Sequence, residues 1–476
     1  MKIDDLDPKE QRRLNILLWL VACGFFMQTL DATIVNTALP SMALSLHESP
    51  LKMQSVVVIY SMAMAMLIPA SGWISDRFGI KLVYLSAIFF FVVGSALCAV
   101  STNLTDVLLA RALQGFGGAM LLPVGRLSIL RSSPRHQFLQ AMSFIAVPGM
   151  IGPLIGPALG GWLVENASWQ WIFLINLPVG TIGFIASLVY MKEELTPSTS
   201  NFDWLGYGLL AATMDALCLA IDGSSGLGLK PISIWGLSLL GLLSLSAYIY
   251  HALKNPTPLF SLNLFKTSSL SVGLFGNLFS RLGGASLPFL VPLMLQITMN
   301  FSPLQAGLMM LPAALTGMLM KPLTTSIISK LGYKRVLLIN TILVAMSMLM
   351  FLWASPFLPT WIMILGLVAF GGLNSLQFTA MNTLTLIDLR KDQTSSGNAL
   401  LAMVQMLAMG LGVAIAGTLL NTFVHLTQND TLLAFHCTFA VMGGITLAST
   451  IIYTQLKRNP ETWVDENHVT LQSKTI

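Results

Sequence analysis

Residues 49–81 read SPLKMQSVVVIYSMAMAMLIPASGWISDRFGIK, and a related pattern returns at residues 302–334, at a constant offset of 253. The matching positions are Ser49, Pro50, Leu51, Pro69, Gly79 and Lys81 in the first copy, and Ser302, Pro303, Leu304, Pro322, Gly332 and Lys334 in the second. A repeat at a fixed period indicates that one structural unit occurs twice. The sequence therefore predicts two related halves in the same orientation.

The chain around these copies is too apolar for a soluble protein. Its 476 residues are 55% hydrophobic and 9% charged, with a mean hydropathy of +0.75, whereas soluble domains carry about 25% charged residues. The runs 14–30, 53–74, 83–100 and 434–456 contain no acidic or basic side chain except His436, and each is about long enough to cross a bilayer. The four cysteines lie in apolar stretches at unrelated spacings, which predicts core residues and neither a disulfide framework nor a metal site.

We predict fourteen membrane-spanning helices and an all-α integral membrane protein. The predicted spans are 14–36, 53–75, 82–100, 106–125, 139–163, 170–190, 204–222, 233–252, 270–297, 304–328, 336–354, 359–384, 396–422 and 434–456. The repeat aligns the first six spans with the last six. The predicted domains are a six-helix bundle at 1–200, a two-helix insert with its linker at 201–262, and a second six-helix bundle at 263–476.

The basic residues predict the orientation of these spans. Of the 25 basic residues, Arg111, Arg281 and Lys321 fall within spans, and the loops on one side contain only Lys52 and Lys230. The remaining twenty lie on the other side, and such a bias marks the cytoplasmic side of a membrane. Both termini are therefore predicted to be cytoplasmic, with an uncleaved first span. This bias also explains the net charge of +5 without a nucleic-acid partner.

The loop between the second and third spans contains a predicted conformational clasp, formed by Gly72, Asp76, Arg77, Gly79 and Lys81. Its glycines permit a tight turn, Asp76 can lie at a helix N-terminus, and the basic residues can remain among lipid headgroups. The second copy is weaker, because Ser329 stands where the first copy has Asp76. The alternative is an ordinary basic loop that only sets the topology.

Several motifs carry a family resemblance. The loop from Gly72 to Lys81 resembles motif A of the major facilitator superfamily, and residues 30–40, LDATIVNTALP, resemble the first-span signature of its fourteen-helix drug:proton antiporters of the EmrB/QacA type. Residues 111–118, RALQGFGG, resemble motif B of the superfamily. The resemblance covers nearly the whole chain and implies the major facilitator fold, with the spans arranged as 6+2+6.

The fifth span resembles the antiporter motif C. The residues that carry the resemblance are Gly149, Gly152, Pro153, Gly156, Pro157, Gly160 and Gly161. Glycines at intervals of four let another helix approach closely, and the prolines remove backbone donors and favour a bend. We expect a tightly packed, bendable antiporter helix, and the alternative is plain packing of membrane helices.

Charged residues within spans are costly and suggest function. Asp31 is the predicted proton-coupling residue, because a carboxyl group partly removed from water holds its proton more readily; the alternative is a permanently paired structural aspartate. The resemblance links Arg111 to proton transfer, and structural pairing with a carboxylate is its alternative. Asp215 and Asp222, in the insert, are expected to be structural.

Six polar or charged residues within the predicted spans are candidates for the substrate cavity. This set contains Gln28, Asp31, Asn36, Gln114, Arg281 and Lys321. By the repeat offset, Arg281 corresponds to Gln28 and Lys321 to Ile68, so the second half carries cations where the first half is neutral. The basic side chains in the spans therefore make an anionic substrate an alternative.

The sequence predicts a membrane transporter and not an enzyme. It contains no GxxxxGK[ST] loop for ATP and no HExxH pair, and no cofactor or metal is expected. By resemblance, the chain exports amphipathic drugs or other toxic small molecules in exchange for protons across a bacterial inner membrane, as a monomer. The alternatives are an exporter of an anionic metabolite, such as an organic acid or its metal chelate, and a membrane sensor or scaffold that does not transport.

Overall fold

The computed structural model describes residues 8–132, 138–192, 202–223, 226–390 and 393–456, and the regular structure in these residues is helical. The α-helices are α1 (Pro8–Ile34), α2 (Leu39–Ser45), α3 (Gln54–Leu67), α4 (Ser71–Phe78), α5 (Ile80–Val100), α6 (Leu104–Ser132), α7 (Phe138–Asn166), α8 (Trp171–Leu174), α9 (Asn176–Tyr190), α10 (Trp204–Asp222), α11 (Pro231–Lys254), α12 (Ser268–Thr298), α13 (Pro303–Met309), α14 (Leu311–Leu349), α15 (Thr360–Ile387), α16 (Thr394–Leu426), α17 (Thr431–Ala448) and α18 (Thr450–Thr454). Short 3-10 helices are η1 (Val35–Thr37), η2 (Pro50–Lys52), η3 (Ile68–Ala70), η4 (Leu262–Lys266) and η5 (Met350–Trp353).

Thirteen stretches of the described chain are long and apolar enough to cross a membrane. One of them, Pro303–Trp353, has 51 residues, and at about 1.5 Å per residue it is far longer than the roughly 30 Å of a hydrocarbon core. Gly332, with a φ of 74°, interrupts α14, so two helices meet there. The stretch therefore contains two crossings, and the predicted count of fourteen spans is confirmed.

The repeated glycine has the same backbone role in both copies. Gly79 has φ 85° and ψ 145° between α4 and α5, and Gly332 has φ 74° and ψ 155° within α14. L-residues with a side chain rarely adopt a φ of this sign. The repeat therefore preserves two sharp breaks between consecutive spans, and a side chain at either position would strain the backbone.

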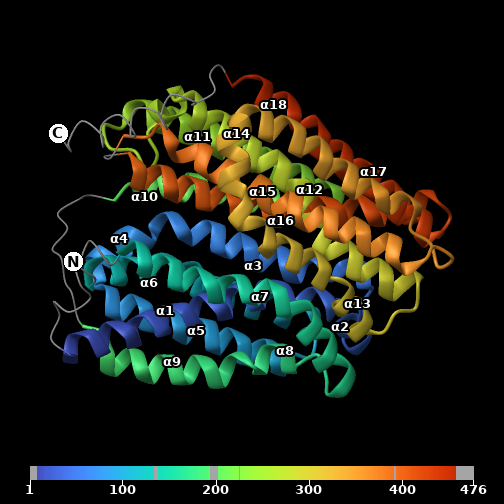
Figure 1. Cartoon of the computed structure of the whole chain (residues 1–476), viewed down its shortest axis with the longest axis horizontal. Helices are drawn as coiled ribbons and strands as arrows, with labels where there is room; N and C mark the ends of the chain where they lie inside the picture. The colour runs from blue at the N-terminus through green and yellow to red at the C-terminus, as the bar shows by residue number, and fades with distance from the viewer. Residues whose placement is uncertain (1–7, 133–137, 193–201, 224–225, 391–392, 457–476) are drawn as a thin grey trace.

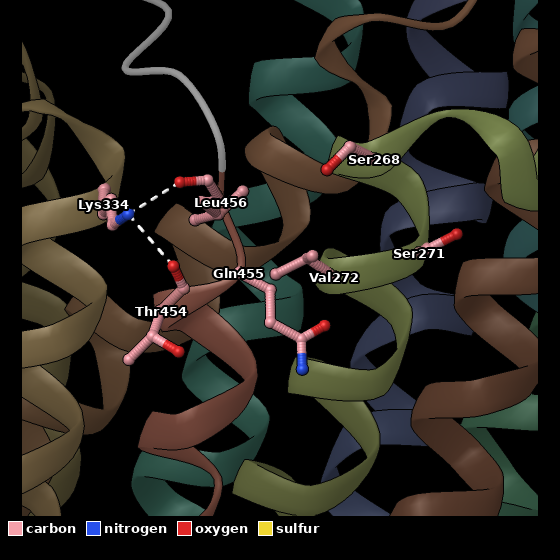
Figure 2. Close-up of a pocket in the computed structure, with 7 residues that line it drawn as sticks. All are labelled: Ser268, Ser271, Val272, Lys334, Thr454, Gln455 and Leu456. Atoms are coloured by element: carbon pink, nitrogen blue, oxygen red, sulfur yellow. Dashed lines mark hydrogen bonds between the residues drawn. The ribbon is translucent and has the colours of Figure 1, made fainter.

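The repeated lysine also has the same contact in both copies. Lys81 Nζ donates to the carbonyl oxygen of Leu188, at the end of α9, over 2.7 Å. Lys334 Nζ donates to the carbonyl oxygens of Thr454 and Leu456, over 3.0 and 2.7 Å, at the end of α18 (Figure 2). A cation at a helix C-terminus compensates carbonyls that have no partner within the helix. Each lysine thus fastens the last helix of its own half.

The spans gather into two groups, which Figure 1 shows as a blue-to-green layer and a yellow-to-red layer. We call α1–α9 the N-terminal helices, α10 and α11 the insert, and α12–α18 the C-terminal helices. The view places α2 and α13 at one end of the molecule and α4 at the opposite end (Figure 1). We name these the outer and the inner end after the topology predicted from the sequence. The fold class predicted from the sequence, a 6+2+6 helical membrane protein, is confirmed.

Hydrogen bonds close the outer end between the two groups. Gln296 Nε2, on α12, donates to the carbonyl oxygen of Thr37 over 3.1 Å. The Leu304 N–H, in the first turn of α13, donates to Glu165 Oε2 on α7 over 3.2 Å. The conformation described here is therefore one in which the two groups touch at their outer ends.

Main chain also meets main chain at the outer end. A Cβ atom at Gly161 of α7 would collide with the carbonyl group of Pro303, and one at Gly307 of α13 would collide with the carbonyl group of Pro157. The two contacts are reciprocal, since each helix places a glycine against the backbone of the other. We call this contact between α7 and α13 the outer seal.

The insert is a helical hairpin beside α3 and α16. Its helices α10 and α11 pack on each other, and α10 contacts both α3 and α16. Asp203 is the N-cap residue directly before α10 and accepts hydrogen bonds from the Gly206 N–H at 3.0 Å, the Leu259 N–H at 3.0 Å and His251 Nε2 at 2.7 Å. These contacts hold the inner end of the hairpin to the segment that leads into α12.

Several predicted spans are interrupted in the structure, and 53–75 and 170–190 are two examples. Span 53–75 is built from α3, η3 and α4, because Pro69 within η3 cannot donate a helical hydrogen bond. Span 170–190 is built from α8 and α9, which meet at Ile175. The first span also begins earlier than predicted, because α1 already starts at Pro8.

Candidate functional site

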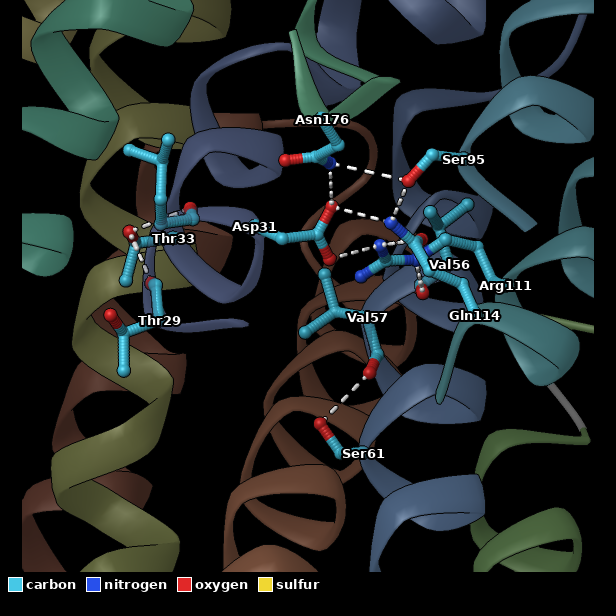
Figure 3. Close-up of polar contacts among 11 residues, drawn as sticks. Thr29, Asp31, Thr33, Val56, Val57, Ser61, Ser95, Arg111, Gln114 and Asn176 are labelled. Atoms are coloured by element: carbon cyan, nitrogen blue, oxygen red, sulfur yellow. Dashed lines mark hydrogen bonds and ion pairs between the residues drawn. The ribbon is translucent and has the colours of Figure 1, made fainter. Parts of the chain in front are cut away.

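The carboxylate of Asp31 lies at the centre of a buried polar network among the N-terminal helices. Arg111 Nη1 donates to Asp31 Oδ2 over 2.6 Å, and Gln114 Nε2 and Asn176 Nδ2 donate to Asp31 Oδ1 over 2.8 and 3.2 Å. Ser95 Oγ accepts from Gln114 at 2.7 Å and from Asn176 at 3.3 Å. Asp31 therefore binds α6 and α9 directly, and Ser95 joins α5 to the same network (Figure 3).

The network is closed to solvent in this conformation. Asp31 is 0% exposed and Arg111 is 1% exposed. The guanidinium group of Arg111 lies 4.1 Å from the centroid of the Tyr60 ring, and its Nε donates to the carbonyl oxygen of Val56 over 3.2 Å. Because the desolvated charges neutralise each other, removing one partner would leave an uncompensated buried charge, at a cost of about 3–5 kcal/mol.

The glycines of α7 pack against the opposite face of α1. Ideal Cβ atoms at Gly152 and Gly156 would collide with the hydroxyl groups of Thr29 and Thr33, and one at Gly160 would lie 2.5 Å from the carbonyl oxygen of Ile34. Figure 3 shows Thr29 and Thr33 on the face of α1 away from Arg111. The glycine stripe therefore sets the position of the helix that carries Asp31.

The stripe continues at both ends. Gly149 lies directly against the ring of Phe25, and Gly161 forms part of the outer seal. The prolines Pro153 and Pro157 lie inside α7, and the carbonyl oxygen of Pro157 accepts a hydrogen bond from Thr37 Oγ1 at 3.2 Å. Every residue of the predicted antiporter helix thus lies on α7, and its glycines contact either α1 or α13.

The predicted clasp contains an ion pair at the inner end. Arg131 Nη2, on the last turn of α6, lies 2.7 Å from Asp76 Oδ1 on α4. Arg77 is exposed, and a Cβ atom at Gly72 would meet nothing within 4 Å. The second copy has a neutral contact instead, in which Ser329 Oγ donates to the carbonyl oxygen of Ser326 over 3.0 Å. The charged form of the clasp therefore belongs to the N-terminal helices.

The other residues predicted for the substrate cavity are dispersed. Gln114 belongs to the Asp31 network, whereas Gln28 and Asn36 are buried, 8% and 6% exposed. Lys321 is exposed on α14. The guanidinium group of Arg281 lies 4.6 Å from the centroid of the Phe378 ring, and no carboxylate lies within ion-pair distance of it among the described residues.

Sequence reasoning missed several members of these networks. Ser95, Asn176 and Tyr60 are neutral residues within apolar spans, and their spacing along the chain gives no sign that they meet Asp31. The structure also contains a neutral network among the C-terminal helices, in which Gln377 Nε2 donates to Thr341 Oγ1 over 2.6 Å and Gln377 Oε1 accepts from Asn340 at 2.8 Å. The two networks differ in that only the first contains charged side chains.

Comparison with known proteins agrees with this architecture. The sequence model of the family described as Major Facilitator Superfamily matches residues 21–413. Two relatives, each named "Putative multidrug resistance protein MdtD", come from Yersinia enterocolitica and Yersinia pestis. They are 51% identical to this chain over 410 and 412 residues, which is 86% of this chain and 87% and 88% of the relatives.

Solved structures share the fold at low sequence identity. The POT family transporter PepTSo has a TM-score of 0.70 at 14% identity, over 93% of this chain and 97% of its own. A mutant of the nucleoside transporter NupG has a TM-score of 0.66 at 14% identity, over 93% of this chain and 100% of its own. At this identity the likeness concerns the fold alone.

Proposed function

Because the chain belongs to the major facilitator superfamily, we propose that it is a proton-coupled secondary efflux transporter that exchanges protons for a small-molecule substrate. The observation that carries the proposal is the buried ion pair of Asp31 and Arg111, 2.6 Å apart. Ionisable groups inside a membrane are costly and mark ion or proton pathways. The buried network among the C-terminal helices contains no charged side chain, so a buried polar network in this fold does not need one.

Protonation of Asp31 would change what holds the network together. In the described contacts its two oxygens accept three hydrogen bonds, from Arg111, Gln114 and Asn176. A protonated carboxyl group has one acceptor position fewer and carries no charge for Arg111. Arg111 would then retain the Val56 carbonyl, the Gln114 side chain and the Tyr60 ring. A proton at Asp31 therefore loosens α1 from α6 and α9, and a proton lost from it tightens them.

This local change reaches the closure between the halves through α1 and α7. The face of α1 opposite Asp31 packs on the glycines of α7, and α7 in turn forms the outer seal with α13. We propose that the antiporter helix transmits a shift of α1 to the seal, and that the Asp76–Arg131 clasp stabilises one of the two conformations. Alternating access then links proton release on one side to substrate release on the other.

The substrate class proposed first is amphipathic drugs or other toxic small molecules. It is supported by the name that both relatives carry, "Putative multidrug resistance protein MdtD". Gln28, Asn36, Arg281 and Lys321 remain the proposed substrate contacts. We also propose a monomer in a bacterial inner membrane with cytoplasmic termini, and the division into domains 1–200, 201–262 and 263–476.

A second candidate substrate class is an anionic metabolite, such as an organic acid or its metal chelate. Arg281 favours it, because this cation lies in the middle of α12 beside an aromatic ring and has no carboxylate partner in the described chain. Asp31 offers no compensation, since its charge is already paired with Arg111. The cationic side chain is therefore available to a negatively charged ligand.

One experiment tests the coupling and compares the two substrate classes. Purified protein in proteoliposomes, under an imposed pH gradient, is offered a lipophilic cationic dye and a radiolabelled tricarboxylate in separate assays. We expect gradient-dependent transport of one class, accompanied by proton movement that a pH-sensitive dye inside the vesicles records. Transport that ignores the pH gradient and moves no protons would reject proton coupling.

A further inference from the structure

The first helix of the insert, α10, ends on a buried carboxylate that binds the N-terminal helices. Asp222, its last residue, is 0% exposed. One of its oxygens accepts from Gln54 Nε2 at 2.7 Å and the other accepts from Ser55 Oγ at 2.5 Å. Gln54 and Ser55 form the first turn of α3. No basic side chain lies within ion-pair distance of Asp222 in the described residues.

The inner end of α10 is held to the same group of helices by aromatic rings. The ring of Trp73, on α4, lies 5.1 Å from Phe202 and 4.9 Å from Trp204, the first residue of α10. Aromatic pairs in such edge-to-face and tilted arrangements contribute beyond their buried area. Both ends of α10 therefore make directional contacts with the N-terminal helices.

The contact of α10 with the C-terminal helices is of another kind. Met214 of α10 shares an apolar cluster with Leu400, Leu401 and Met403 of α16. Beyond this cluster, Thr418 Oγ1 of α16 donates to the carbonyl oxygen of Ile221 over 2.9 Å. A threonine hydroxyl within a helix can instead bond the carbonyl four residues earlier in its own helix. Loss of this contact would therefore still leave the Thr418 hydroxyl a partner within its own helix.

The surface of α16 at this point is smooth. A Cβ atom at Gly417 would collide with the side-chain amide of Gln54, the same residue that binds Asp222. Glycine lets the amide of Gln54 lie directly on the backbone of α16. The junction of α10, α3 and α16 is thus polar and specific on the α3 side, and smooth on the α16 side.

We propose that Asp222 is a positioning residue that fastens the insert to the N-terminal helices, so that α10 moves with them and α16 slides past α10 when the transporter changes conformation. Separation of α10 from α3 would leave a buried carboxylate without its donors, which is costly. Separation of α10 from α16 breaks one hydrogen bond, from Thr418 to Ile221, and otherwise replaces one set of apolar contacts by another. The insert then moves as one rigid body with the N-terminal helices.

Spin-label distances test this assignment in the full-length protein. The four native cysteines are replaced by alanine, and labels are placed in pairs at three exposed positions: Lys230 on the insert, Thr105 on α6 and Thr422 on α16. Double electron–electron resonance then gives distance distributions between the insert and each group, and between the two groups. Spectra are compared at pH 5 and pH 8, and in the Asp31→Asn background.

Between these conditions, we expect the distance distribution between Lys230 and Thr105 to keep its mean and width. The Lys230–Thr422 and Thr105–Thr422 distance distributions should both shift. The opposite assignment, in which the distance from Lys230 to Thr422 stays constant while that to Thr105 shifts, would overturn the proposal. If no distance responds to pH or to Asp31→Asn, the variants of Asp222 decide the question without any coupled transition.

Asp222→Ala should broaden the distribution between Lys230 and Thr105, and Asp222→Asn, whose amide can still pair with Gln54 and Ser55, should restore most of it. The matched control is Asp215→Ala, which removes from the same helix a carboxylate whose Oδ1 has no hydrogen-bond partner among the described residues. An unchanged distribution in Asp222→Ala, or equal broadening in the control, contradicts the proposal. Proton coupling can fail while this result stands, because the variant comparison does not depend on transport.

Discussion

At the scale of the residue, Asp31 combines a role in folding with its proposed role in coupling, and a substitution separates the two. Asp31→Asn keeps the size of the side chain but leaves Arg111 without its counter-charge, so we expect a loss of stability of about 3–5 kcal/mol. Gradient-driven transport should be lost as well. The double variant Asp31→Asn, Arg111→Gln should recover much of the thermal stability without recovering transport. Accumulation of substrate at the parental rate by the single variant would show that Asp31 is not the coupling carboxyl.

A second residue, Asp203 at the inner end, makes the stability of the folded protein depend on pH. Burial alone raises the pKa of Asp203, but hydrogen bonds from the Gly206 N–H, the His251 ring and the Leu259 N–H outweigh it and hold the pKa below its usual value. A depressed carboxyl pKa stabilises the folded state above the unfolded value, about 3.9, and this contribution disappears as the pH falls through the folded value. Asp203→Asn should therefore lower the melting temperature at pH 7 and converge with the parent in acid. A constant difference from pH 7 to pH 3 would contradict this.

The limits of prediction from sequence are also clearest at single residues. Asp31 and Arg111 could be singled out, because charges in apolar spans are rare, and their pairing was one of the alternatives. Asn176 and Ser95 could not be found, since a neutral polar side chain in a span has many ordinary roles and only tertiary packing brings it to Asp31. Asp222 was expected to be structural, but the sequence could not say that its partners lie on α3.

At the scale of the element, the packing of α7 on α1 is the feature most exposed to a small change. A valine at Gly156 would push on Thr33, whose Cβ lies 3.2 Å from the added carbon, and on the backbone of Ile34 at 3.3 Å. We expect Gly156→Val to separate the two helices and to abolish most transport at near-normal expression. Gly183→Val is the control, because a Cβ atom at Gly183 of α9 meets nothing within 4 Å. Equal activity of both variants would place the stripe outside the mechanism.

The clasp between α4 and α6 should affect transport more than stability. Asp76 and Arg131 are 36% and 23% exposed and 2.7 Å apart, and such partly exposed pairs contribute roughly 1 kcal/mol or less. Asp76→Asn should therefore change the melting temperature little while altering the transport rate. Ser329→Ala, at the repeat-related position, is the matched control. Parental kinetics in Asp76→Asn would reduce the motif to a topology signal.

At the scale of the whole molecule, the repeat and the hydropathy pattern were sufficient for the fold, because a membrane leaves helices few arrangements. Gly79 in the first copy and Gly332 in the second are repeat-related, and each makes the same break in the backbone. Hydropathy located the insert along the chain but could not show which helices it packs against, because lipid-facing and protein-facing apolar surfaces have the same composition. The interrupted spans were likewise hidden, since a break at Pro69 leaves the apolar run intact.

The orientation of the whole molecule is open to direct measurement. Single cysteines near Lys192 and Lys474 should react only with reagents that enter the cytoplasm, and those near Lys52 and Lys230 should react from outside. The reason is the bias of basic residues between the two sets of loops. Labelling of intact cells with an impermeant thiol reagent, against permeabilised cells as the reference, checks the arrangement. Reaction near Lys474 from outside would overturn the even number of crossings.

The outer seal has a consequence for the cell as a whole. Since Gly161 and Gly307 each press on the backbone of the facing helix, the barrier is made of main chain, and no single truncated side chain can open it. A bulky residue at either glycine would act as a wedge. If the wedge admits water, protons would leak back into the cell through the protein, and the proton gradient across the membrane would be dissipated without transport. Such alleles would be recognised by poor growth yield in drug-free medium, and they would be selected against even where no toxic compound is ever met.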